Sequence, residues 1–182
     1  MIYLIGGPPR VGKSKLSQKL VERKNIPFCP TDAIFHMLIR TAPQLGIKDG
    51  QGYQNKAKSF YPYLKCFIHM MAYSVEDYCI EGDSFLPEQV DQLLKEEDLK
   101  EFDIRCVFLG LSKLTHQQMM DNIGQNAWLL NKSKEEQENT AKSTIERSNL
   151  LKEECHKYNL KYIDQAEDFE NGQEEAYSYL LS

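Results

Sequence analysis

The chain has 182 residues, a formal net charge of −5 and 27% charged residues. This length suits one domain with a sizeable core, so we expect a single domain over residues 1–182. The 22 basic residues are scattered among 27 acidic ones, which argues against sequence-independent binding to duplex nucleic acid or to anionic lipid. We therefore expect neither a nucleic-acid partner nor a membrane partner, although a local basic pocket could hold a small anion.

The cysteines and the N-terminus bear on localisation. The five cysteines lie far apart, without a C-x-x-C pair or a histidine at zinc spacing. The N-terminus has neither the basic segment nor the apolar core of a signal peptide, and no apolar run approaches the length of a membrane span. These features predict a cytoplasmic protein with reduced thiols.

The first predicted element is a buried strand over residues 1–5, which are apolar or aromatic. Residues 7–14 follow it, read GPPRVGKS and match the Walker A phosphate-loop (P-loop) pattern G-x-x-x-x-G-K-[ST]. Gly7 and Gly12 allow the backbone to curl around an anion with its N–H groups pointing inward. The helix that starts near Lys13 directs its N-terminus at the phosphates.

Two side chains of this loop are candidates for chemistry. Lys13, expected as an exposed loop cation, can reach the β- and γ-phosphate oxygens, and the hydroxyl of Ser14 can ligate Mg²⁺. The residues expected to bind the nucleotide are those of the loop and of the first helical turn: Gly7, Pro8, Pro9, Arg10, Val11, Gly12, Lys13, Ser14 and Lys15.

The next elements also alternate between helix and strand. Apolar residues at helical spacing predict a helix over 13–24, and a short apolar strand follows at 26–29. Thr31 is a plausible N-cap for a second helix, which places Asp32 in the first turn.

A breaker-rich stretch over 42–55 predicts an exposed loop, and helical apolar spacing predicts a helix over 54–76. Residues 77–83 then form a short strand that ends in Glu81 and Asp83. The remaining predicted elements are a helix over 87–97, a strand over 104–109, a helix from Thr115 to Ile123, a helix over 133–156 that begins with a capping box, a strand over 160–163 and a helix over 172–181. This alternation favours an α/β domain with a mostly parallel sheet.

With its strand, phosphate loop, helix and early acid, the chain resembles the P-loop small-molecule kinases. This group includes the adenylate, shikimate and gluconate kinases, chloramphenicol phosphotransferase and the zeta-type toxins. The resemblance implies a three-layer P-loop nucleoside-triphosphate hydrolase fold, with a five-stranded parallel sheet in the order 2-3-1-4-5. It also implies an acceptor-binding region at about 31–76, a helical lid at about 112–147, and the use of ATP and Mg²⁺.

The resemblance further implies roles for acids at the strand ends. Asp32 resembles the acid that accepts the proton of the acceptor hydroxyl, although it could also be a plain helix N-terminal acid favoured by the dipole. Glu81, with Gly82, is similar to an Asp-Gly pair that positions Mg²⁺ through water and lines the acceptor site. Asp83 could take that role instead, or bind hydroxyls of the acceptor.

Lid cations of this group stabilise charge on the transferred phosphoryl group. Arg147 is the one arginine between residues 106 and 182, and we expect it to have this catalytic role. Alternatives on the same segment are Lys132, Lys134 and Lys142. Of the earlier arginines, Arg10 lies in the phosphate loop, and Arg40 is better placed for an anionic acceptor.

These features predict an ATP-dependent phosphotransferase whose acceptor is small and hydrophilic, anionic or polyhydroxylated. Two alternatives stay open. One is a nucleotide-binding regulatory ATPase, or switch, without a small-molecule acceptor, and the other is a toxin-like kinase of a nucleotide sugar. A GTPase is disfavoured because no Asn-Lys-x-Asp motif follows a strand.

Overall fold

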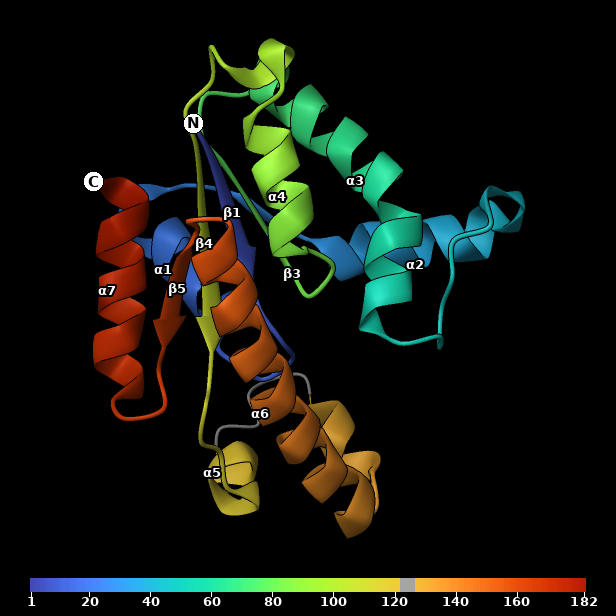
Figure 1. The fold of residues 1–182 in the computed structure, drawn as a ribbon, viewed down its shortest axis with the longest axis vertical. Helices are drawn as coiled ribbons and strands as arrows, with labels where there is room; N and C mark the ends of the chain where they lie inside the picture. Colours follow the sequence, from blue (N-terminus) through green and yellow to red (C-terminus); the bar gives the residue numbers. More distant parts are fainter. Residues whose placement is uncertain (122–126) are drawn as a thin grey trace.

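A computed structural model describes residues 1–121 and 127–182. Its centre is a five-stranded sheet in the order β2-β3-β1-β4-β5, in which all neighbouring strands are parallel (Figure 1). The strands are β1 Ile2–Gly6, β2 Phe28–Pro30, β3 Tyr78–Gly82, β4 Ile104–Gly110 and β5 Lys161–Asp164. The predicted α/β class and the predicted strand order are confirmed.

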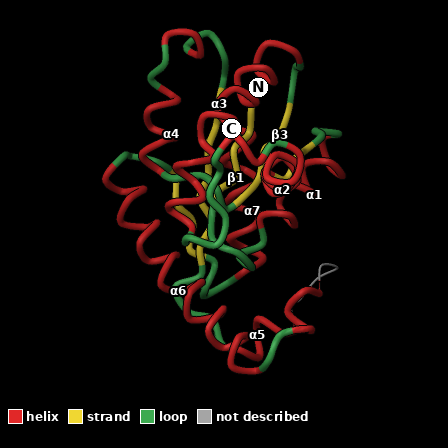
Figure 2. Tube along the Cα trace, turned by 90° about the vertical axis from the view of Figure 1, so that its right-hand side faces the viewer, coloured by secondary structure: helices red, strands yellow, loops and turns green. Residues whose placement is uncertain are grey.

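Seven α-helices lie within the described ranges, and they cover both faces of the sheet (Figures 1 and 2). Their bounds are α1 Lys13–Lys24, α2 Thr31–Thr41, α3 Tyr53–Ser74, α4 Pro87–Leu94, α5 His116–Asp121, α6 Lys134–Lys157 and α7 Phe169–Leu181. Three short 3₁₀ helices are η1 Pro43–Leu45, η2 Glu97–Leu99 and η3 Ala127–Asn131. None of these described helices combines the length and the apolar character needed to cross a membrane.

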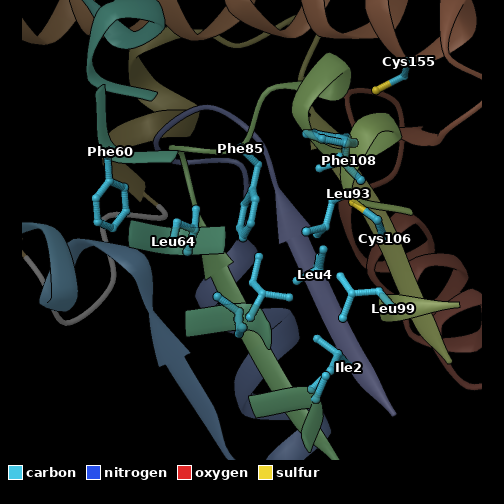
Figure 3. Packing of buried hydrophobic residues seen from close by; sticks show 14 of the residues in the cluster. Ile2, Leu4, Phe60, Leu64, Phe85, Leu93, Leu99, Cys106, Phe108 and Cys155 are labelled. Atoms are coloured by element: carbon cyan, nitrogen blue, oxygen red, sulfur yellow. The ribbon is translucent and has the colours of Figure 1, made fainter. Parts of the chain in front are cut away.

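The central strand β1 is buried along its whole length because it has a helical layer on each side. Ile2 and Leu4 point into one core, which α2, α3, α4 and α6 complete, as Figure 3 shows in part. Tyr3 and Ile5 point into the other core, where side chains of α1 and α7 cover the sheet. The period of two along the strand thus fills two separate cores from one five-residue segment.

Several predicted element ends differ from the structure. Thr31 is not an N-cap: Pro30 holds that position, α2 begins at Thr31, and the buried Thr31 hydroxyl has no hydrogen-bond partner. The hydroxyl packs instead against Gly82, where an added Cβ would lie 1.8 Å from Thr31 Oγ1. At the C-terminal end, α7 begins at Phe169 rather than 172, because Asp168 caps it by accepting from the N–H of Asn171 at 3.0 Å.

The segment predicted as a lid follows the carboxyl end of β4. Helix α5, η3 and the first turns of α6 lie at the end of the molecule opposite both termini (Figures 1 and 2). The predicted capping box is confirmed, since Ser133 Oγ accepts from Glu136 N at 3.2 Å and Glu136 Oε2 accepts from Ser133 N at 2.9 Å. The predicted helix through Ile123 is described only to Asp121, because residues 122–126 lie outside the described ranges.

Candidate active site

The phosphate loop connects the end of β1 to the start of α1, as predicted. Gly7 and Gly12 have φ values of 142° and 86°, which disfavour residues with a side chain. A Cβ on Gly7 would lie 2.4 Å from the carbonyl oxygen of Leu109, and one on Gly12 would lie 2.7 Å from the ring of Phe169. Both glycines are therefore required by backbone conformation and by close packing.

Lys13 is buried rather than exposed, which corrects the expectation of a solvated loop cation. Its side chain turns back into the loop, where Nζ donates to the carbonyl of Pro8 at 2.7 Å. Burial lowers the pKa of Lys13, an effect that the nearby carboxylates of Glu81 and Asp83 oppose. A phosphate in the loop would offer this ammonium an anionic partner in place of a peptide carbonyl.

Ser14 and Glu81 meet at the carboxyl ends of β1 and β3. Ser14 Oγ donates to Glu81 Oε1 at 3.1 Å, and Glu81 is paired in register with Ile5 of β1. Its side chain is buried, and burial raises the pKa of its carboxyl group despite the proximity of Lys13 and the hydrogen bond from Ser14. The hydroxyl and carboxylate oxygens are hard ligands of the type that Mg²⁺ prefers.

The donor set fits a magnesium ion held partly by water and by substrate. Within the described part of the chain, no three or more His, Cys, Asp or Glu side chains are grouped so as to hold a metal. Mg²⁺ usually keeps several waters and is bound through one or two protein oxygens together with substrate phosphates. Ser14 and Glu81 would supply such oxygens.

A second group of charges lies beside these residues and joins α2, α3 and the loop after β3. Lys56 Nζ donates to Asp32 Oδ1 at 2.9 Å and to Asp83 Oδ1 at 3.0 Å, and it lies 4.5 Å from the centroid of the Phe35 ring. Burial alone would lower the pKa of Lys56, but Asp83 and Asp32 outweigh it and raise that pKa. Burial would likewise raise the pKa of Asp83, yet Lys56, Lys13 and Arg147 hold it below its usual value.

Arg147 reaches this group from α6. Its Nη2 donates to the backbone carbonyl of Asp83 at 3.4 Å, and Nη1 lies 3.8 Å from Asp83 Oδ2. The guanidinium also stacks over the ring of Tyr53 at 4.2 Å from the centroid. Burial lowers the pKa of Arg147, with Asp83 and Tyr53 acting against it.

The overall arrangement matches that of several solved structures of kinases. A gluconokinase from Sinorhizobium meliloti 1021 superposes with a TM-score of 0.53 at 17% identity, covering 99% of this chain and 90% of its own. A shikimate kinase from Bacteroides thetaiotaomicron gives a TM-score of 0.56 at 17% identity, covering 99% of this chain and 95% of its own. A shikimate kinase from Acinetobacter baumannii in complex with shikimate gives 0.55 at 15% identity, covering 98% and 90%. The chain therefore has the fold of the P-loop small-molecule kinases.

At these identities the likeness concerns the fold. No family model matches the sequence, and no curated protein matches it either. The P-loop kinase fold is therefore identified from the order of the strands in the sheet, together with one short sequence motif.

The other basic residues predicted to bind substrate differ in their burial and in their partners. Lys15 forms an ion pair with Glu170 of α7 and lies over the Phe169 ring. Arg10, at a φ of 71°, is half-buried, and burial lowers its pKa. Arg40 is exposed in the last turn of α2, eight residues after Asp32 and so about 12 Å further along the helix axis.

The alternatives to Arg147 lie on the surface of α6 or, for Lys132, just before that helix. Lys132 pairs with Glu136 at 2.9 Å, and Lys134 lies 4.0 Å from Glu138, both at i,i+4 spacing. Lys142 is exposed. Arg147 is the one of these four that contacts the residues at the end of β3.

Sequence reasoning did not single out several residues around this site. Lys56 is one of the four lysines between residues 31 and 76 that the sequence offers to an anionic acceptor, and nothing local distinguishes it from Lys48, Lys58 or Lys65. Tyr53 stands at the first position of α3, inside the expected loop. Residues that contact the phosphate loop from distant elements also carry no motif, and these are Thr144, Gln165, Phe169 and Gln173.

Proposed function

We propose that the protein is an ATP-dependent phosphotransferase that moves the γ-phosphoryl group of ATP to a small hydrophilic acceptor. One observation carries this proposal. The phosphate-loop residues Lys13 and Ser14 and the acid Glu81 lie next to a charged group formed by Asp32, Lys56, Asp83 and Arg147, which we call the acceptor cluster. A site that only bound nucleotide would have no need for the acceptor cluster beside the position of the γ-phosphate.

The residues divide between the two substrates. The phosphate loop and Lys13 would bind the β- and γ-phosphates of ATP, and Ser14 with Glu81 would hold Mg²⁺ directly or through water. When bound, this ion would neutralise charge on the phosphate oxygens. Arg147 would add positive charge from α6, as we expect of the lid-side cation.

Asp32 would act as the base. As the acceptor oxygen attacks the γ-phosphorus, its proton passes to the Asp32 carboxylate, and the bond from the γ-phosphorus to the bridging oxygen breaks to release ADP. The Asp32 side chain is 58% exposed, whereas that of Lys56 is 16% exposed. An incoming acceptor therefore meets the carboxylate first, with the lysine behind it.

This mixture of donors and acceptors suits an acceptor rich in hydroxyl groups or carrying a compact anion. Lys56, Arg147 and the more distant Arg40 could pair with an anionic group, and Asp32 and Asp83 with hydroxyls. All five cysteines are free thiols, which supports a reducing, cytoplasmic setting for the reaction.

An ATP-consumption screen tests the proposal. Purified protein with ATP and Mg²⁺ is offered nucleosides, nucleoside monophosphates, sugar acids, nucleotide sugars and aminoglycoside-like alcohols, and ADP formation is measured with and without each compound. We expect turnover to depend on a second small molecule, with formation of its phosphorylated product. If a nucleotide sugar were the best acceptor, the protein would be the toxin-like kinase rather than a kinase of another small molecule.

The regulatory alternative predicts a different result. A nucleotide-dependent switch would bind or slowly hydrolyse ATP at the same rate with every compound, and Asp32→Asn would leave that rate unchanged. Acceptor-independent turnover of this kind would contradict the proposed transferase.

A further inference from the structure

Side chains from distant elements bind the carbonyl groups of the phosphate loop. Thr144 Oγ1 of α6 donates to the carbonyl of Pro9 at 3.2 Å. In the second half of the loop, Gln165 Nε2 donates to the carbonyl of Val11 at 2.7 Å, and Gln173 Nε2 of α7 donates to that of Gly12 at 3.4 Å. Each of these bonds spans more than 130 positions of the chain, so each fixes the loop relative to the body of the fold.

The two glutamines form one buried unit. Gln165 is 1% exposed and Gln173 is fully buried, and Gln173 Nε2 also donates to Gln165 Oε1. The backbone N–H of Gln165 donates to the carbonyl of Gly110 at 2.9 Å, which ties the start of the β5–α7 turn to the end of β4. The side chain of Gln165 is therefore held at both of its ends.

The geometry of the peptide group links these contacts to anion binding. In a trans peptide the carbonyl and the following N–H point in opposite directions. The hydrogen bond from Gln165 to the Val11 carbonyl therefore turns the N–H of Gly12 away from Gln165. The Gly12 carbonyl accepts both from Gln173 and from the N–H of Leu16 at 3.1 Å, and these two bonds together set the direction of the N–H of Lys13. These N–H groups matter in this loop because Pro8 and Pro9 have none, which leaves the donors of residues 10–14 to contact phosphate.

An uncharged donor suits this place. A lysine or arginine buried as deeply as Gln165 would require the burial of an unpaired charge, and a carboxylate could not donate to a carbonyl. A primary amide donates to Val11 and accepts from Gln173 at the same time.

We propose that Gln165, supported by Gln173, is a positioning residue that sets the orientation of the Val11–Gly12 peptide for phosphate binding. This role rests on the proposed nucleotide site. It concerns the affinity of the loop for phosphate groups and is independent of which acceptor is used.

The test is calorimetric binding of inorganic pyrophosphate, and separately of ATP with Mg²⁺, to wild type and to three methionine variants. Gln165→Met keeps the length of the side chain but removes its hydrogen bonds, and we expect about tenfold weaker binding of both ligands, since a buried bond of this kind contributes about 1 to 2 kcal/mol. Gln173→Met should weaken binding less, by about threefold, because its bond to the loop is longer. Gln89→Met is the matched control.

Gln89 is also a buried glutamine, but its amide bonds to Leu86 N and the Ala57 carbonyl, away from the loop. We expect Gln89→Met to lower the melting temperature while leaving pyrophosphate binding within twofold of wild type. If Gln89→Met lost as much pyrophosphate affinity as Gln165→Met, the loss would be due to general destabilisation of the fold, and the proposal would be overturned.

A second variant applies if Gln165→Met fails to fold. Gln165→Glu has nearly the same shape, and its carboxyl group can donate to the Val11 carbonyl only when protonated. Because burial as deep as that of Gln165 raises the pKa of a carboxyl group, the loss of affinity relative to wild type should be larger at pH 8 than at pH 6. Wild-type affinity in Gln165→Met, or a pH-independent ratio in Gln165→Glu, would refute the positioning role alone. Absence of pyrophosphate and ATP binding in wild type would refute the proposed function as well.

Discussion

Lys56 Nζ lies 2.9 Å from Asp32 Oδ1, so the carboxylate that we propose as base has a lysine as its partner. The same ammonium binds Asp83 at 3.0 Å, and Asp83 in turn contacts Arg147. The acceptor cluster thereby connects α2 and α3 to α6. The hydrogen bond from Lys56 fixes the direction of the Asp32 carboxylate, and Asp83 together with Arg147 limits how far the lysine can move.

Replacement of Asp32 with Asn should separate catalysis from nucleotide binding. The amide cannot take a proton, so we expect kcat to fall by about two to four orders of magnitude, while the dissociation constant for ATP stays within a few-fold of wild type. Single-turnover kinetics and calorimetry would measure the two quantities. An equal loss in both would make Asp32 a metal-binding or structural residue.

The burial of Lys13 predicts that its charge lowers the stability of the folded protein. Its pKa in the folded state is lowered, so between that value and the unfolded value of 10.5 the unfolded state binds more protons and stability rises with pH. At neutral pH the buried ammonium is therefore destabilising. Lys13→Met should keep or raise the melting temperature while reducing phosphoryl transfer by about two to three orders of magnitude.

Lys19 provides the matched control for Lys13. It lies on the same helix with the same 9% exposure, but it pairs with Glu174 at 2.9 Å. Lys19→Met should lower the melting temperature and leave the transfer rate within threefold of wild type. If Lys13→Met also retained its rate, the assignment of the phosphate loop would be wrong.

The fold could be predicted from the sequence because its signals are local. The apolar strand, the phosphate loop and the following helix are contiguous, and all were predicted within a few residues. The wrong N-cap involves long-range packing. Thr31 has a favourable residue type for an N-cap, but the approach of Gly82 from β3 determines where its hydroxyl lies.

The phosphate loop could be predicted from its motif, but the contacts among the other residues of the site could not. Lys56 is 24 positions from Asp32, and Arg147 is 64 positions from Asp83, so nothing in the local pattern brings them together. The family resemblance pointed to the acids at the strand ends, but it did not distinguish one lysine of α3 from its neighbours. The contacts among Asp32, Lys56, Asp83 and Arg147 depend on the order of strands in the sheet and on the long helix α6.

Glu81 should make magnesium binding depend on pH. Burial raises its pKa above the ordinary glutamate value of 4.5, and a carboxyl group must be ionised to hold Mg²⁺ or its waters. The affinity for Mg²⁺ in the presence of ADP should therefore fall as the pH drops through the raised pKa. Glu81→Gln should weaken Mg²⁺ binding by about 10-fold to 100-fold at neutral pH and remove this pH dependence.

The same shift predicts the stability of the Glu81→Gln variant. With a folded pKa above the unfolded one, the folded state binds more protons in the window between them, so wild-type stability falls as the pH rises through it. Glu81→Gln keeps an acceptor oxygen for Ser14 and has no charge to bury. Its melting temperature should exceed that of wild type at pH 7.5, and the difference should shrink toward pH 4.5. A variant less stable than wild type at pH 7.5 would contradict this account of Glu81.

The relative effects of Lys56 and Arg40 should report the size of the acceptor. Lys56 is bonded to Asp32 itself, whereas Arg40 lies about 12 Å further along α2. For a compact acceptor, Lys56→Met should raise KM for the acceptor by about 10-fold or more and also lower kcat, because the direction of the base changes. Arg40→Met should then change the acceptor KM by less than threefold, and both variants should bind ATP like wild type.

An acceptor with an anionic group far from its reacting hydroxyl would instead make Arg40→Met the more damaging change. KM values for a series of acceptors of increasing length, measured on both variants, distinguish the two cases, and an effect on ATP affinity in either variant would refute the division of the site that we propose.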